Sequence, residues 1–196
     1  PNQDRFGCYI AAICGLGMPT LRDRDSVDDK FKLSQAGIFG RLVKNAEGLQ
    51  ILLINYFSVK VHIDQWVGYW MPIPTSERMK LGVRKGFSIL GQDAVIGDRI
   101  WDCQTKFRII LGPLSMDDYS RFLPSGSSFS KLVDIVKLYI GIELDWELQL
   151  LLQRDKVPPM QLGSEIYLGW TTWLGEMKEK HEVRGLKISS SNVSLI

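Results

Sequence analysis

The chain has 196 residues, of which 45% are hydrophobic and 23% are charged, and these are the proportions of a globular protein rather than a disordered one. Its 24 lysines and arginines against 22 aspartates and glutamates leave a formal net charge of only +2. Binding to nucleic acid or to an anionic membrane usually needs a stronger basic surface. We therefore expect no nucleic-acid partner and no direct membrane insertion.

The N-terminal segment, residues 1–35, contains the longest run without charge, from Phe6 to Met18. This run is shorter than the roughly 20 residues that cross a bilayer, and we predict a strand within it at Cys8 to Ile13. The mixed-charge run that follows, from Arg22 to Lys32, is typical of a solvated linker. Because the first residue is Pro rather than Met, we expect this segment to be part of a larger N-terminal region.

Three cysteines, Cys8, Cys14 and Cys103, form an odd number, which suits a reducing compartment better than a set of disulfides. We therefore expect the cytosol. Cys8 and Cys14 lack the Cys-x-x-Cys spacing of zinc and redox sites, so we interpret them as packing residues.

An internal repeat organises the remaining chain, and it is seen first in two helical patterns. A group of four apolar positions begins at Leu49 and recurs with the same spacing from Leu132. That spacing places all four side chains on one face of a helix, so both helices are predicted to bury the same stripe. The stripe residues are Leu49, Leu52, Leu53 and Tyr56 in the first copy and Leu132, Ile135, Val136 and Tyr139 in the second.

A half-buried strand is predicted after each helix, because the apolar period there changes to two residues. It falls at Val59 to Ile63 in the first copy and, less regularly, at Ile142 to Trp146 in the second. Further along each copy comes a proline-containing loop, Trp70 to Pro74 and Val157 to Met160.

Pairs of leucine and glycine mark the later part of each copy. We predict that their glycines supply positive φ in turns between short strands. Five residues separate the last pair of each copy from another glycine. The matching pairs are Leu81-Gly82 with Leu162-Gly163, and Leu90-Gly91 (then Gly97) with Leu168-Gly169 (then Gly175).

These elements predict an α+β fold, in which two helix-strand-loop units lie on small, mostly antiparallel sheets. The first unit covers residues 36–124, and the second, with a C-terminal tail, covers residues 125–196. The boundary from Ser125 to Ser130 is typical of a turn and a helix N-terminus, with a serine capping a helix that begins near Lys131.

A search for catalytic or metal-binding residues finds no motif. His62 falls on the polar side of a predicted strand and His181 in a charged stretch, and neither has a partner at metal-ligand spacing. Two close acidic pairs, Asp117-Asp118 and Glu143 with Asp145, fit a helix start and an outer strand face. We therefore expect no catalytic residue, no cofactor and no metal, and we interpret the chain as non-enzymatic.

Short motifs follow one another in a characteristic order between Ala36 and Gly175. They are Gly37-Ile38-Phe39, Tyr56-Phe57-x-Val-x-Val, Gly68-x-Trp70, Leu90-Gly91, Gly97-x-x-x-Trp101-Asp102, Phe107-Arg108, Gly112-Pro113-Leu114, Phe122-Leu123-Pro124 and Leu168-Gly169-Trp170. In these motifs the chain resembles the TssG (ImpH) family of baseplate subunits of bacterial type VI secretion systems. The segment from Gly15 to Pro19 resembles the family pattern only imperfectly.

The resemblance implies a structural wedge component that joins two copies of TssF to two trimers of the TssK adaptor, with TssE and the sheath nearby. It also implies a place in the cytoplasm, in a baseplate docked at the inner membrane through its partners. No catalytic residue comes with the resemblance. A generic protein adaptor, or a small enzyme with no recognisable motif, is the alternative.

Partner-binding residues are expected in the two proline loops, because a duplicated element offers two similar surfaces. Proline lowers the entropy of a loop before binding, and we expect each loop to dock one TssK trimer through apolar side chains. The residues are Trp70, Met71, Pro72, Ile73 and Pro74 in the first loop and Val157, Pro158, Pro159 and Met160 in the second.

The tryptophans give a second reason to expect interfaces. There are six of them, more than one small core readily covers, and exposed apolar patches mark protein contacts. They are Trp66, Trp70, Trp101, Trp146, Trp170 and Trp173.

Overall fold

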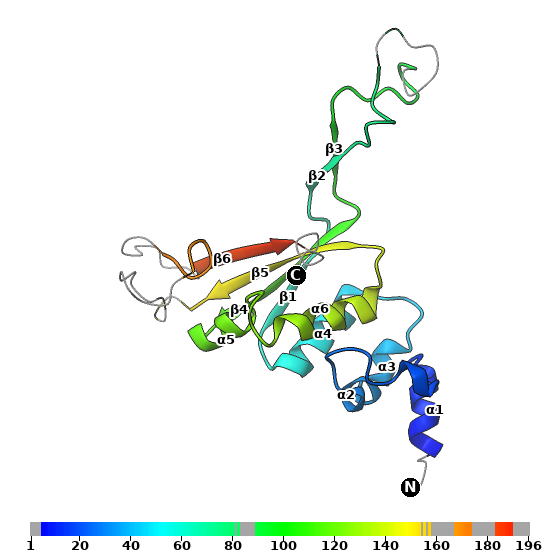
Figure 1. Ribbon diagram of the computed structural model, residues 1–196, viewed down its shortest axis with the longest axis vertical. Helices are drawn as coiled ribbons and strands as arrows, with labels where there is room; N and C mark the ends of the chain where they lie inside the picture. The colour runs from blue at the N-terminus through cyan, green and yellow to red at the C-terminus, as the bar shows by residue number, and fades with distance from the viewer. Residues whose placement is uncertain are drawn as a thin grey trace.

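A computed structural model describes residues 5–80, 82, 89–153, 155, 157, 167–173 and 183–189. A mixed four-stranded sheet forms its centre, with two long helices packed on one face and a two-stranded hairpin standing away from it (Figure 1). The predicted α+β class is therefore confirmed.

The central sheet has the strand order β1-β4-β5-β6. Strand β1 pairs antiparallel with β4, β4 pairs parallel with β5, and β5 pairs antiparallel with β6. Strands β2 (Tyr69–Pro72) and β3 (Arg99–Asp102) also pair antiparallel, so the predicted, mostly antiparallel pairing is confirmed among the described strands, with β4 and β5 as the parallel exception. The strands of the central sheet are β1 (Val61–Asp64), β4 (Lys106–Leu114), β5 (Asp145–Leu152) and β6 (Val183–Ser189).

Helices α4 (Ala46–Phe57) and α6 (Phe129–Ile140) are the two that the repeated pattern predicts. The Asn45 side chain caps α4 by accepting a hydrogen bond from the Gly48 N–H, a standard N-cap contact. Helix α6 begins after Ser128, as expected, but that serine side chain makes no capping hydrogen bond. The predicted start of the second helix near Lys131 is therefore close to the observed start at Phe129, whereas its predicted serine cap is not confirmed.

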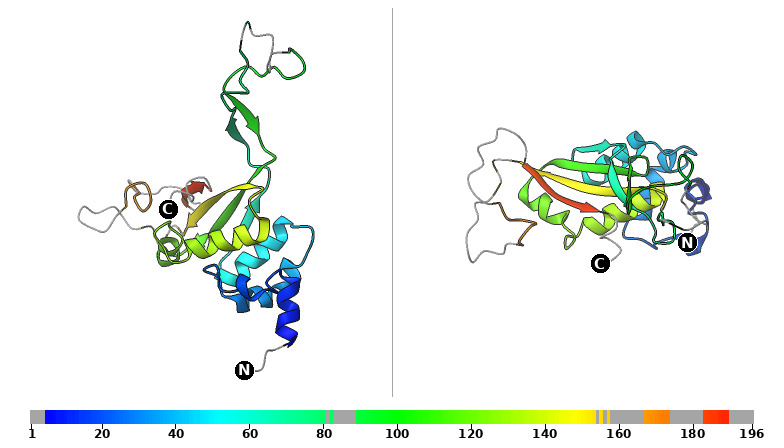
Figure 2. Two further views of the ribbon diagram at one scale, coloured as in Figure 1. Left: turned by 45° about the vertical axis from the view of Figure 1, so that its right-hand side comes forward. Right: turned by 90° about the horizontal axis from the view of Figure 1, so that it is seen from above.

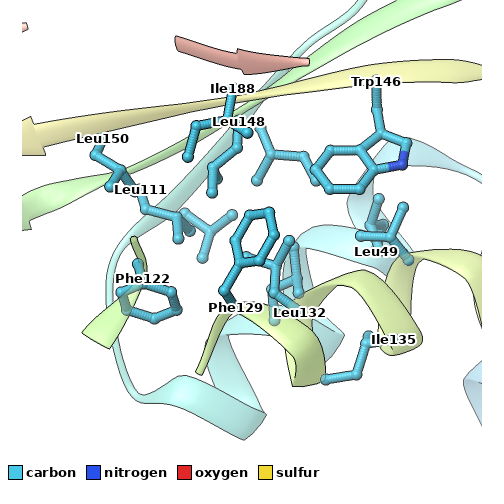
Figure 3. Packing of buried hydrophobic residues seen from close by; sticks show 14 of the residues in the cluster. Leu49, Leu111, Phe122, Phe129, Leu132, Ile135, Trp146, Leu148, Leu150 and Ile188 are labelled. Carbon is cyan, nitrogen blue, oxygen red and sulfur yellow. The ribbon is translucent and has the colours of Figure 1, made fainter. Parts of the chain in front are cut away.

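The hydrophobic core lies between these helices and the covered face of the sheet (Figure 3). Both helices bury leucine or isoleucine from the predicted stripe, and β4 and β5 contribute alternate residues. Burying one such side chain contributes about 1.5–3 kcal/mol. The labelled members are Leu49, Leu111, Phe122, Phe129, Leu132, Ile135, Trp146, Leu148, Leu150 and Ile188.

The strand predicted at Cys8 to Ile13 is wrong, because these residues belong to helix α1 (Arg5–Ile13). A short apolar run does not distinguish a strand from a helix by period alone, and two alanines within it favour helix. A 3-10 turn (η1, Pro19–Leu21) and the short helices α2 (Asp29–Ser34) and α3 (Ala36–Phe39) complete the N-terminal part.

The charged run from Arg22 to Lys32 is not the solvated linker that was predicted. Lys32 is buried, and its Nζ lies 2.7 Å from carboxylate oxygens of both Asp25 and Asp29. The backbone N–H of Ser26 donates to Asp134 on α6, 2.8 Å away. The Ser26 hydroxyl also donates to Asp134, 2.6 Å away. An ion cluster and these long-range hydrogen bonds therefore hold this run against the helices.

Helix α5 (Met116–Arg121) follows β4 and confirms the interpretation of its acidic pair. Ser115 caps the helix by accepting from the Asp118 N–H. Asp117 and Asp118 lie in its first turn, where the helix dipole favours negative charge.

The second predicted strand begins later than expected. Ile142 and Leu144 are exposed and precede the strand, which runs from Asp145 to Leu152. A buried strand inside a sheet shows a nearly continuous apolar run rather than strict alternation, and the run from Leu148 to Leu152 was the better signal.

The expected superposition of the two repeat units is not confirmed by the strand arrangement. Strands β1 and β5 run in opposite directions, because β1 is antiparallel to β4 and β4 is parallel to β5. Superposing β5 on β1 requires turning the second unit by half a turn in the plane of the sheet, which keeps its helix on the same face. After that rotation β6 lies on one side of the superposed strands and β4 lies on the other. Tyr139 is buried whereas Tyr56 is half-buried, so these two positions also differ.

We predict that Lys32→Met lowers the free energy of unfolding by about 1–3 kcal/mol. The change leaves Asp25 and Asp29 without their buried cation, although both carboxylates keep some contact with water, which reduces the penalty. Urea unfolding measures the effect. Lys30→Met on the same helix is the control, because Lys30 is exposed, and equal midpoints for both variants would contradict the prediction.

Candidate interaction surface

The most prominent surface is an arm, residues 68–104, that projects from the sheet between β1 and β4 (Figure 1). Strands β2 (Tyr69–Pro72) and β3 (Arg99–Asp102) form its stem as an antiparallel pair. Trp70 lies directly opposite Trp101, with ring centroids 5.4 Å apart at an interplanar angle of 69°. More than half of each of these indole side chains is exposed.

Specific contacts fix the base of the arm. The Trp101 ring packs so closely on Gly68 that a Cβ there would overlap it. The Tyr69 hydroxyl lies 3.0 Å from the Thr105 hydroxyl, and the Asp102 carboxylate accepts hydrogen bonds from the backbone and side chain of Thr105. The stem is thus held at a defined position on the sheet.

A polar network covers the helix-free face of the sheet beside the arm. Glu147 pairs with Arg108, and the Lys106 Nζ lies 2.9 Å from the other Glu147 oxygen. Burial alone would raise the pKa of Glu147, but the hydrogen bonds from Lys106 and Arg108 outweigh burial and hold that pKa below its usual value. The glutamate therefore stays ionised as the anion that both cations require.

The first predicted loop lies at the start of the arm, and its residues differ in exposure. Trp70, Met71 and Pro72 are exposed on β2, and Pro74 is exposed just beyond it. Ile73, in contrast, is only 7% exposed, and its backbone carbonyl accepts from the Arg78 guanidinium. Ile73 is thus part of the arm's own packing.

The second predicted loop is described at only one of its four residues. Val157 is partly buried and packs against the core. Pro158, Pro159 and Met160 lie outside the described residues.

Exposed apolar residues beyond the predicted loop extend along the arm. Leu90 is 88% exposed, and Ile89, Val95, Ile96 and Ile100 are also exposed. The sequence predicts turns at Leu90-Gly91 and Gly97, and no binding role was expected for their apolar neighbours. The missed signal was the density of aliphatic residues in a segment already predicted to be turn.

A further segment, residues 167–173, lies near α5 at the opposite end of β5 from the arm (Figure 1). The buried Tyr119 on α5 donates its hydroxyl to the Trp170 carbonyl, 2.8 Å away. The Trp173 ring contacts Tyr119 at 5.8 Å between centroids. This segment is thus anchored to the body of the protein, with Leu168 exposed at its surface.

Helix α1 carries another exposed apolar stripe. Phe6, Tyr9 and Ile13 are spaced for one helix face, and all three are exposed. The helix points away from the sheet on the side opposite the arm (Figure 2). The exposed tryptophans and this stripe confirm that folding leaves apolar surface uncovered.

A groove of about 520 Å³ lies where the arm meets the body. It is lined by side chains of mixed character that include Lys44, Trp66, Lys106 and Tyr139. The Tyr139 hydroxyl donates to the Asn45 carbonyl, and Lys106 is paired with Glu147. Both of these polar groups are thus engaged in contacts within the fold.

The residues tested for chemistry lie apart. His62 is exposed on β1, 3.2 Å from Asp64, and His181 lies outside the described residues. Cys14 is half-buried, and burial raises the pKa of its thiol. Within the described part of the chain, no group of three or more His, Cys, Asp or Glu residues could hold a metal ion. No helix among those same residues is long and apolar enough to span a membrane.

We predict that Gly68→Ala disrupts the Trp70–Trp101 pair, because the added methyl would occupy the space of the Trp101 ring. The near-ultraviolet circular dichroism of the tryptophans should decrease while the far-ultraviolet spectrum stays the same. Gly37→Ala is the matched control, since a Cβ there meets no atom within 4 Å. An unchanged tryptophan signal in Gly68→Ala would show that the pair does not depend on this glycine.

Comparison with known proteins places these features in a family. Two solved chains share the fold, one in a cryo-electron microscopy structure of the type VI secretion system TssK-TssF-TssG baseplate subcomplex and one in the baseplate complex of that system. The first has a TM-score of 0.74 and 22% identity over 93% of this chain and 77% of its own. The second has a TM-score of 0.67 and 19% identity over 96% of this chain and 53% of its own.

A search of the curated proteins gave no match. The sequence model of the family described as TssG of type VI secretion matches residues 1–175. Because this match covers most of its 196 residues, the chain belongs to the TssG family of type VI secretion.

Proposed function

We propose that this chain is a structural subunit of the type VI secretion baseplate that joins TssF to TssK adaptors and carries out no catalysis itself. The observation that carries the proposal is the arm, whose exposed tryptophan pair and aliphatic residues make no contact with the core. A folded chain that exposes this much apolar surface is built for protein contacts.

The arm is proposed to dock TssK. Tryptophan is the residue most enriched among binding hot spots, because its large ring buries much area with few rotatable bonds. Trp70 and Trp101 are already ordered against each other at the stem, so little side-chain entropy remains to be lost on binding. Each proline loop would engage one TssK trimer, giving two trimers per chain.

Helix α1 is the surface that we propose for TssF. A protein that joins two partners needs separate surfaces for them, and the α1 stripe and the arm lie at opposite ends of the molecule (Figure 1). Two TssF copies, with TssE and the sheath nearby, complete the proposed arrangement. The assembly would lie in the cytoplasm and reach the inner membrane through its partners.

Co-expression tests this function. We expect the chain alone to aggregate as its concentration rises and to become monodisperse when TssF and TssK are present, because partners cover the apolar arm and the α1 stripe. Size-exclusion chromatography with light scattering measures the state of each sample. A chain that stays monomeric at high concentration, and that elutes apart from both partners, would overturn the proposal.

The double variant Trp70→Asp/Met71→Asp tests the first loop. We expect TssK binding to weaken by about 1–3 kcal/mol per buried anchor, while TssF binding and the melting temperature stay unchanged, since both side chains are exposed. Ile73→Asp is a poorer test, because Ile73 is buried and its loss would also disturb the arm. Ile142→Asp, on the body, is the control, and equal TssK titration curves for it and the double variant would count against the loop.

A further inference from the structure

Two short segments far apart in the chain form the same turn. In residues 89–93 the Ile89 carbonyl accepts from the N–H groups of Gln92 and Asp93, at 3.1 and 3.2 Å. In residues 167–171 the Tyr167 carbonyl accepts from the N–H groups of Trp170 and Thr171, both at 3.0 Å. We call these the first and second leucine turns, after the leucine that follows each residue whose carbonyl accepts these hydrogen bonds.

The two leucine turns also share their cap and their backbone geometry. A side chain four residues on accepts from the first N–H of each turn, Asp93 at 2.7 Å and Thr171 at 3.0 Å. The third residue is a glycine with φ of 83° in Gly91 and 81° in Gly169. A positive φ at this position is the mark of a type II turn and accounts for the glycine in both copies.

Each turn places a leucine in water at the same position. Leu90 is 88% exposed and Leu168 is 87% exposed, and the preceding residues Ile89 and Tyr167 are 54% and 59% exposed. An exposed leucine brings no stability to the monomer, because its apolar area stays in contact with water. A hydrogen-bonded turn that holds it there fixes the direction of the side chain before any partner arrives.

We propose that Leu90 and Leu168 are matched contact residues that enter the same apolar pocket on two copies of one partner. Two exposed leucines held in the same turn geometry, with different neighbouring residues, are suited to two identical pockets, one on each copy of the partner. The inference rests on the proposed function, from which the two copies are the two TssK trimers. It adds the leucine turns to the proline segments as contacts with that partner.

The two turns are carried differently, and the difference has a consequence for assembly. The second is tied to the body by the Tyr119 hydroxyl and the Trp173 ring, whereas the first lies far out on the arm, whose stem pairs only four residues per strand. The second copy of the partner is therefore held at a fixed angle, and the first can adjust as the arm bends. One chain can thus bind two identical partners at sites that are not related by symmetry.

The test counts TssK trimers bound to the full chain in complex with TssF, by native mass spectrometry. The variants are Leu90→Asp, Leu168→Asp and the double variant, with Ile142→Asp as a control because that side chain is 88% exposed on the body. We expect each single variant to lose one trimer, its site weakening roughly tenfold or more. The double variant should lose both, and the control neither.

Leu90→Met and Leu168→Met should keep both trimers, since methionine retains the apolar volume, and melting temperatures of all variants should match the wild type. Two trimers on the double aspartate variant would overturn the assignment of the leucine turns while leaving the proposed function intact. A single variant that loses both trimers or none would also overturn it. A wild-type complex that binds no TssK would instead overturn the proposed function.

Discussion

The fold depends on packing between two helices and a single face of one mixed sheet. Helices α4 and α6 pack there, and Leu148 and Leu150 on β5 lie at the centre of the contact (Figure 3). The other face carries Arg108, Glu147 and Lys106 as a charged network, so the described residues form no second apolar layer behind the strands. This core supports the arm between β1 and β4, none of whose described residues belongs to the core.

Sequence reasoning found the parts of the fold that this packing requires. The stripes of both helices bury as predicted except at Tyr56, which is half-buried, because a period of 3.6 leaves few other ways to cover four apolar side chains. The strand predicted at Val59 to Ile63 overlaps the observed β1, Val61–Asp64. The failures fall where a local pattern is ambiguous. The run from Cys8 fits a helix as well as a strand, and the direction of β5 depends on its pairing with β4, which a single sequence does not encode locally.

The interaction surface was predictable in outline but not in detail. The surplus of tryptophan and the proline loop pointed to the arm, and the structure places Trp70 and Met71 in the open. The inward turn of Ile73 was not predictable, because alternation at a short hairpin depends on register, and register follows from the pairing of Pro72 with Arg99. The burial of Lys32 was also not predictable, because it depends on how the chain folds back. One partner, Asp29, lies on the same helix, and the other, Asp25, lies before that helix begins.

The duplicated Leu-Gly marks raise the question of what kind of repeat this chain retains. The strand arrangement does not repeat, since β4 and β6 flank their partners on opposite sides. The turns at Gly91 and Gly169 nevertheless agree in hydrogen bonds, φ and exposure of the preceding leucine. Agreement that is confined to short surface turns cannot be explained by packing, because neither leucine packs on the core. A requirement outside the monomer, which acts on both turns alike, explains it more simply than shared folding constraints do.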